Sequence, residues 1–137
     1  MAQSKSWFYK SFWLTKGKVA FLEIIGEFDE QGLLEFNRYL RDTYLDTGYP
    51  PVHCIIDTAG FSGFPRNFRT LKDCTAISAT HPNMGYVVLI GYENAMLGFL
   101  ATSLSQLLGD KFKLVQSLQE ARALLKHVDD RLTEDIA

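Results

Sequence analysis

The sequence is poor in cysteine, lacks a long apolar run and carries no excess of charge of one sign. Its 137 residues include two cysteines, Cys54 and Cys74, which are too few for a disulfide framework and lack zinc-site spacing. Lys and Arg number 14 against 16 Asp and Glu, so no basic field would attract nucleic acid or an anionic membrane. The longest weakly charged segment, residues 94–109, is too short and too rich in Ser, Thr and Gln to span a bilayer.

Targeting and catalytic motifs are missing as well. The first residues, MAQSKSWFYKSFWLTKGK, lack the apolar core and cleavage site of a secretory signal, which predicts a cytoplasmic protein. The patterns GxGxxG, GxxxxGKS/T and GxSxG do not occur, and His53, His81 and His127 fall on different expected elements without ligand spacing. We therefore expect no cofactor, no metal site and no catalytic residue.

What is present is the alternation of an α/β protein, expected to form one domain over residues 1–137 with a core at about 7–127. A short turn with Gly17 makes the first two strands an antiparallel hairpin, and the later strands, separated by helices, are expected to be parallel. The tail from Asp129 is expected to fray. The expected strands are 7–14, 19–25, 52–56, 85–92 and 111–116. Of the expected helices, the first is capped by Asp29 and runs through Tyr44, and the second starts at Pro65 and passes Ile77. The other two cover 94–109 and 117–128. The order is β-β-α-β-α-β-α-β-α, which predicts a mixed, mostly parallel sheet covered by helices.

The first strand is aromatic on both of its faces. A strand of this kind either packs on both sides or leaves one aromatic face exposed as a dimer surface. Trp7, Tyr9 and Trp13 share one face, and Phe8, Phe12 and Leu14 share the other.

The stretch VHCIIDTAGFSGFPRNF, residues 52–68, is where we expect the working surface, because ligands bind beyond the carboxyl ends of strands in open α/β sheets. Asp57 could act there as a base or bind a metal, or it could accept backbone N–H groups and hold the loop. Arg66, Arg69 and Lys72 oppose the dipole of the next helix, which indicates an anion or acidic partner, or simply a solvated face. Of the phenylalanines at 61, 64 and 68, those not in the core would form an apolar patch.

The expected helix at 94–109 has no charged residue from position 95 onward. A covering helix in a small domain usually has a charged face. This helix is therefore either buried on more than one side, for example in a homodimer, or lines an apolar pocket. The residues expected at that ligand or dimer surface are Met96, Phe99, Leu100 and Leu104.

Three short motifs resemble those of STAS domains, the fold of bacterial anti-sigma-factor antagonists, and in particular the SpoIIAA-like proteins. The segment IIGEFD at 24–29 is similar to the family's first strand–helix junction, and IIDTAGF at 55–61 is similar to its central strand and loop. The last helix of the family is similar to SLQEARALL at 117–125. The resemblance implies a regulatory, protein-binding module. The family's phosphorylated serine falls near residues 65–68, PRNF, where this chain has no hydroxyl, so the phosphoserine switch is not expected.

The leading hypothesis is a non-catalytic regulatory module that binds a protein partner. A second hypothesis is a carrier of a lipid or other apolar small molecule, which requires an enclosed cavity beneath the uncharged helix. A third, an enzyme using Asp57, requires a second polar group converging on that carboxylate. The residues expected at the partner surface are Asp57, Thr58, Phe61, Ser62, Phe64, Arg66, Asn67 and Arg69.

Overall fold

The computed structural model describes residues 6–64, 67–91 and 95–132, without the side chains of 95 and 96. It contains one five-stranded sheet in the order β1-β2-β3-β4-β5. The hairpin strands β1 and β2 are antiparallel, and every other neighbouring pair is parallel. The strands are β1 (Trp7–Thr15), β2 (Val19–Glu27), β3 (Val52–Gly63), β4 (Met84–Ile90) and β5 (Phe112–Val115); the helices are α1 (Glu30–Leu40), α2 (Phe68–Ala79), α3 (Ala95–Leu108) and α4 (Leu118–Val128). This order confirms the predicted α/β architecture.

Capping residues fix where the helices begin. The Asp29 carboxylate accepts a hydrogen bond from Gly32 N–H at 2.7 Å and starts α1, as predicted. The Ser117 hydroxyl accepts from Glu120 N–H at 3.1 Å and starts α4, whereas the Glu120 carboxylate accepts from Gln116 N–H at 3.0 Å. The two bonds form a capping box whose return bond is shifted by one residue. A π-helical turn, Arg41–Leu45, extends α1.

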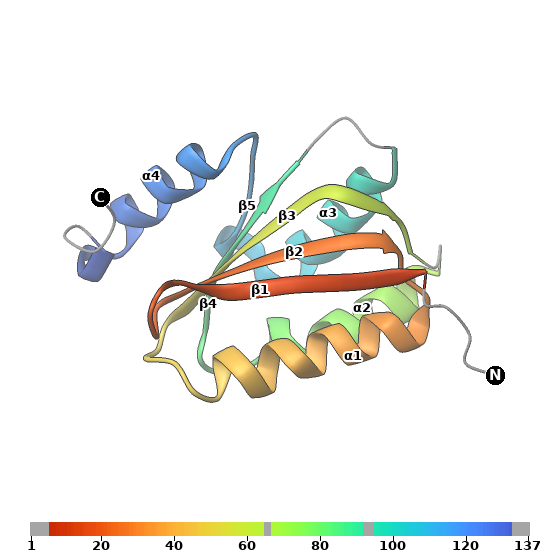
Figure 1. Ribbon diagram of the computed structural model, residues 1–137, viewed down its shortest axis with the longest axis horizontal. Coiled ribbons are helices and arrows are strands. Elements are labelled where there is room, and N and C mark those ends of the chain that lie inside the picture. The colour runs from red at the N-terminus through yellow and green to blue at the C-terminus, as the bar shows by residue number, and fades with distance from the viewer. Residues whose placement is uncertain (1–5, 65–66, 92–94, 133–137) are drawn as a thin grey trace.

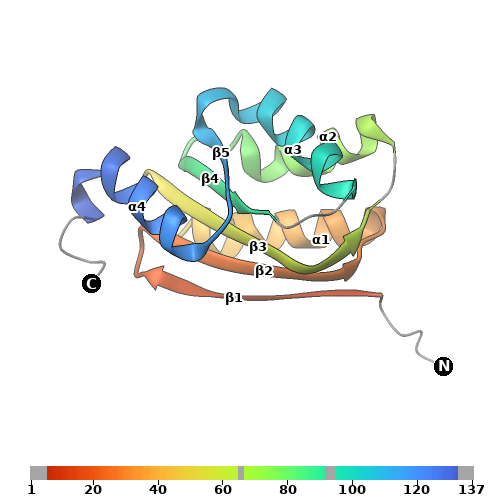
Figure 2. The ribbon, with the colours of Figure 1, turned by 90° about the horizontal axis from the view of Figure 1, so that it is seen from above.

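The helices cover the two faces of the sheet unequally. Helices α1, α2 and α3 pack with one face in the main hydrophobic core, and α2 contacts both of its neighbours. Helix α4 lies apart from them in both views (Figures 1 and 2) and packs in a smaller core on the other face. That smaller core contains Val19, Ile55, Val88, Ile90, Val115, Ala121, Leu125 and Leu132.

The face covered by α4 stays partly open over β1. The exposed fractions of Phe8 and Phe12 are 50% and 53%, while Trp7 on the opposite face of β1 is buried. The Phe12 ring stacks on Phe21 with a centroid distance of 5.2 Å. We call this exposed region around Phe8 and Phe12 the back face. Of the two alternatives for β1, the one with an exposed aromatic face is correct.

Candidate functional site

Strand β3 is longer than predicted. The expected loop after Ile56 instead continues as strand to Gly63, because β2 offers a partner strand as far as Glu27. The pairing with β4 ends at Asp57, so the last part of β3 pairs with β2 alone. The register between β2 and β3 shifts between Glu23 and Ile25, opposite the stretch from Asp57 to Gly60.

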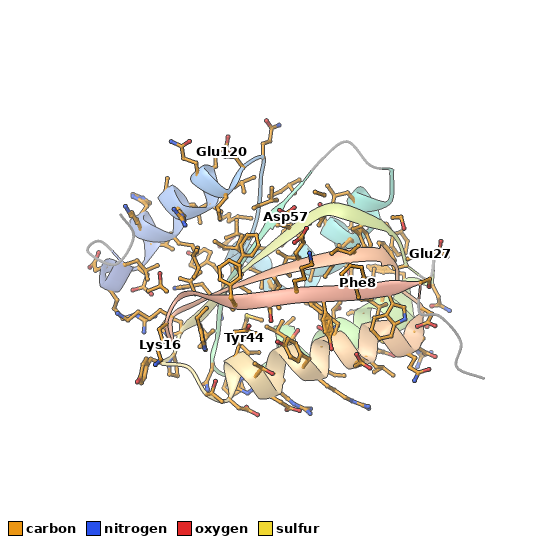
Figure 3. All side chains as sticks on the ribbon, in the orientation of Figure 1. Phe8, Lys16, Glu27, Tyr44, Asp57 and Glu120 are labelled. Carbon is orange, nitrogen blue, oxygen red and sulfur yellow. The ribbon has the colours of Figure 1, made fainter. Side chains whose placement is uncertain are left out.

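Asp57 and Thr58 hold this irregular part of the strand in place. The Asp57 Oδ1 atom accepts a hydrogen bond from Ala59 N–H at 2.9 Å. Asp57 projects from the face of the sheet opposite α1 (Figure 3). The Thr58 hydroxyl is buried and donates to the Ile90 carbonyl at 2.7 Å, at the carboxyl end of β4. Asp57 thus makes the structural contact considered from the sequence, and Thr58 lies inside the domain.

The phenylalanines of this region extend the main core. Phe61 and Phe64 are each 5% exposed, and their rings stack at a centroid distance of 5.5 Å. Phe61 lies 6.2 Å from Phe28, and Phe64 lies 5.4 Å from Phe99. Phe61 and Phe64 therefore pack within the domain and add little to its outer surface.

Helix α2 begins at Phe68, three residues after Pro65, which the sequence predicted in its first turn. Asn67 is its cap, and the Asn67 Oδ1 atom accepts from Thr70 N–H at 3.2 Å. Pro65 and Arg66 lie outside the described residues. Among the predicted partner-site residues, Ser62, Asn67 and Arg69 are exposed, and Asp57 is half-buried. The exposed residues at the end of β3 and the start of α2 define what we call the β3–α2 surface: Ser62, Asn67 and Arg69. Asp57 projects from the other face of the sheet and is not brought next to them.

The uncharged helix α3 faces the core with its leucines. Leu100 and Leu104 are buried, and Phe99 packs against Phe64 and Phe68. The side chain of Met96 lies outside the described part of the chain. The exposed positions of α3 are small or polar: Gly98, Thr102, Ser105 and Gln106. The helix therefore needs no charged face, because uncharged polar residues meet the solvent.

A small cavity lies between the sheet and helices α1, α2 and α3. Its volume is about 50 Å³, and Leu100 and Leu104 contribute to a mostly apolar wall. The polar members of the wall are engaged: Ser78 donates to Asn37 Oδ1 at 2.6 Å, and Thr75 donates to the Leu71 carbonyl at 2.8 Å. Helix α3 thus lines a small apolar cavity, while an apolar ligand or a dimer partner at this helix stays a prediction.

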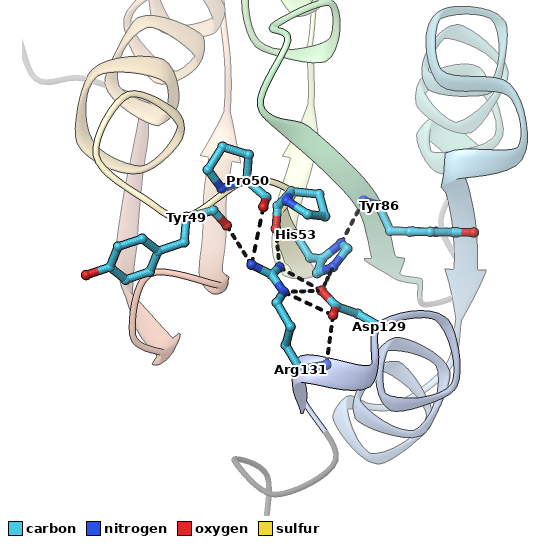
Figure 4. A network of polar contacts seen from close by, with 7 residues as sticks. Tyr49, Pro50, His53, Tyr86, Asp129 and Arg131 are labelled. Atoms are coloured by element: carbon cyan, nitrogen blue, oxygen red, sulfur yellow. Dashed lines mark hydrogen bonds and ion pairs between the residues drawn. The ribbon is translucent and has the colours of Figure 1, made fainter.

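A buried polar network at the opposite end of β3 was not predicted (Figure 4). The His53 ring is 2% exposed; its Nδ1 accepts from Tyr86 N–H at 2.9 Å, and its Nε2 lies 2.8 Å from Asp129 Oδ2. Arg131 donates to the same carboxylate at 2.7 Å and to the Pro51 carbonyl at 2.7 Å. Residues 129–132 are therefore fixed, and the predicted fraying there is wrong. The one sequence signal was a histidine inside an apolar strand.

The environment of this network sets its protonation. Burial lowers the pKa of His53, and the hydrogen bonds from Arg131 hold the pKa of Asp129 below its usual range. Since Nδ1 accepts a backbone hydrogen bond, the ring is neutral and carries its hydrogen on Nε2. Both ring nitrogens are occupied, so His53 has a structural role and no free nitrogen for proton transfer.

Reactive groups are sparse in the described part of the chain. Cys54 and Cys74 are buried free thiols, and burial raises the pKa of Cys54 to about 12. Within residues 6–64, 67–91 and 95–132, no group of three His, Cys, Asp or Glu side chains is placed to hold a metal ion. No helix in these ranges is long and apolar enough to cross a membrane.

Comparison with solved structures identifies the fold. The crystal structure of an uncharacterised protein of the DUF3478 family from Shewanella loihica PV-4, described as having a SpoIIAA-like fold, superposes with a TM-score of 0.63. The match covers 91% of this chain and 99% of that one. The fold is SpoIIAA-like. At 12% sequence identity the likeness concerns the fold alone. No family model matches this SpoIIAA-like chain, and no curated protein matches it in sequence.

Proposed function

We propose that this SpoIIAA-like protein is a non-catalytic, cytoplasmic regulatory module that binds a protein partner through the β3–α2 surface. The supporting observation is that the polar groups along β3 and at the start of α2 already serve the fold. Asp57 binds Ala59 N–H, Thr58 binds the Ile90 carbonyl, and Asn67 caps α2. An enzyme built on Asp57 has less support, because its carboxylate already accepts from Ala59 N–H and the neighbouring residue in the strand register, Glu23, adds only a second carboxylate.

The charge of this surface indicates the partner's chemistry. Arg69 lies exposed in the first turn of α2, where its positive charge opposes the helix dipole. A basic residue at this position would be compensated by a carboxylate from a partner, which points to an acidic protein surface. At the start of α2 the cap is Asn67, without a phosphorylatable hydroxyl. We therefore propose regulation by binding without a phosphoserine switch.

The carrier hypothesis has weaker support. The cavity beneath α3 measures about 50 Å³. An apolar cavity that holds benzene is roughly 150 Å³, so a lipid chain would need a much larger space. Carriage of a lipid would therefore require α3 to move away from the sheet.

Affinity capture from the native host tests the proposal. The double variant Ser62→Glu, Arg69→Glu reverses the charge of the surface, and we expect it to retain at most about a tenth of the main partner. The control is Lys16→Glu, an exposed position in the β1–β2 turn at the other end of β2 (Figure 3), which should retain the partner fully. Full retention by the double variant would contradict binding at the β3–α2 surface.

A further inference from the structure

Strand β1 is an open edge of the sheet. It is nine residues long, whereas β5 at the other edge has four. In Figure 2 β1 runs along one side of the molecule with no element beyond it. Natural proteins usually protect a long edge strand with proline, several charges or a covering segment. Strand β1 has no proline and one charged residue, Lys10, and it exposes Phe8 and Phe12.

The hydrogen-bond pattern shows which main-chain groups face outward. Glu27 N–H donates to the Ser6 carbonyl at 2.8 Å, so residues 6 and 27 form a hydrogen-bonded pair. Because such pairs alternate along an antiparallel ladder, the N–H and C=O groups of Tyr9, Ser11 and Trp13 point away from β2.

The same residues are fixed by side-chain contacts to the helix layer. The Tyr9 hydroxyl donates to Glu35 at 3.0 Å, and the Ser11 hydroxyl lies 2.6 Å from that of Tyr39. The Tyr44 hydroxyl donates to Ser11 at 2.7 Å. The edge is thus held in an extended form before any partner arrives, which lowers the entropy cost of pairing.

We propose that β1 pairs antiparallel with β1 of a second copy, about a two-fold axis at Ser11, joining two five-stranded sheets into one. This register places the outward-facing residues opposite each other: Ser11 faces the partner's Ser11, and Tyr9 faces the partner's Trp13. Residues 9–13 of the two strands are then paired, on the near side of the register shift between Trp13 and Thr15. Lys10 lies beside the partner's Phe12, a cation–π pairing, whereas an axis at Lys10 would oppose two lysines.

The helix layer complements this register. Tyr9 contacts Glu35, and Trp13 contacts Tyr44, so α1 and its π-helical extension run alongside β1. One strand residue spans about two helix residues, which places the axis near position 40. The partner's Asp42 then comes to the level of Arg38.

Arg38 and Asp42 lie on the side of α1 next to Tyr9, and Asp42 Oδ1 also pairs with Arg41 of its own chain at 2.7 Å. Both line a surface groove of about 420 Å³ that also includes Tyr9 and Tyr39. In the pair this groove would lie between the two α1 helices, with Arg38 of each chain near the partner's Asp42. This charge complementarity favours a second copy over an unrelated peptide, which would bring no matching helix. The inference does not depend on binding at the β3–α2 surface.

Analytical ultracentrifugation of the full chain at a series of concentrations tests the pairing. We expect a two-chain species that dissociates on dilution. Phe12→Lys places a lysine next to the partner's Lys10 at two symmetric positions, and it should raise the dimer Kd at least about a hundredfold. Circular dichroism should show that this variant remains folded, because Phe12 is already 53% exposed.

A charge swap separates edge pairing from other contacts. Arg38→Glu and Asp42→Arg should each raise the Kd about tenfold, and the double variant should return it to within about threefold of the wild type. Lys72→Glu, exposed on α2, is the matched control and should leave the Kd unchanged.

Three results would overturn the inference. The first is a chain that stays monomeric at every concentration, whether or not it binds an extended peptide. The second is a dimer that survives Phe12→Lys. The third is a dimer that Phe12→Lys abolishes but neither charge variant affects, which would place the contact on the back face.

Discussion

The His53 ring makes two hydrogen bonds that require opposite roles from its nitrogens. Nδ1 accepts from Tyr86 N–H, so Nε2 donates to Asp129. A second proton on Nδ1 would set two donors against each other, which agrees with the lowered pKa that burial gives this group. His53 therefore connects the start of β3 to residues 129–131 and helps to hold α4 against the sheet.

This protonation state makes the stability depend on pH. Below about pH 6.5 the unfolded chain gains a proton at His53 before the folded chain does, so the free energy of unfolding falls as the pH drops. His53→Gln keeps a neutral donor and acceptor but does not titrate, and it should flatten the dependence. Urea unfolding of both proteins between about pH 5.5 and 7.5 measures the effect. Equal slopes would show that His53 does not cause the dependence.

Local signals predicted some of these residues and missed others. The role of Asp57 could be weighed in advance because an aspartate that ends an apolar run commonly accepts a nearby N–H. The network of His53 could not, because its partners Asp129 and Arg131 lie far along the chain. The burial of Phe61 and Phe64 depended equally on distant rings, Phe28 and Phe99.

At the scale of the element, the first turn of α2 carries a charge that does not stabilise the helix. Its first turn contains Arg69 and no acidic residue, although the N-terminus of a helix favours negative charge. The fold gains nothing from this arrangement. The proposed binding role would explain why a residue that opposes local stability lies on the exposed β3–α2 surface.

The position of Arg69 predicts that one substitution will separate stability from binding. Arg69→Glu should raise the free energy of unfolding by about 0.3–1 kcal/mol, because a carboxylate in the first turn complements the helix dipole. Lys72→Glu lies beyond the first turn and should give a smaller gain. Urea unfolding of the two variants provides the comparison. A loss of stability in Arg69→Glu would mean that the arginine serves the fold.

The order of the strands and helices could be predicted from the sequence better than the residues at which they end. The strands and helices occur in the predicted order because each has a clear apolar period and a cap or turn at its boundary. Strand β3 ran past its predicted end because β2 supplied a partner that local sequence does not show. Helix α2 begins at Phe68 because the Asn67 side chain caps its first turn.

At the scale of the whole molecule, three helices fill one face of the sheet and a single helix covers part of the other. Periodicity alone could not show this, since both faces of β1 are aromatic in sequence. The result is a domain with three distinct regions: the β3–α2 surface, the closed network around His53 and the open β1 edge. The solved structure with a SpoIIAA-like fold is 12% identical to this chain, so the likeness concerns the fold and leaves these three regions to be tested on this chain itself.

Hydrogen–deuterium exchange of the complex recovered from the native host tests the central claim most directly. The account predicts that the partner slows exchange over residues 60–63 and 67–71, while exchange in the Lys16 turn and in β1 stays as in the protein alone. Protection confined to another surface, or no added protection at the end of β3 and the start of α2, would contradict binding at the β3–α2 surface.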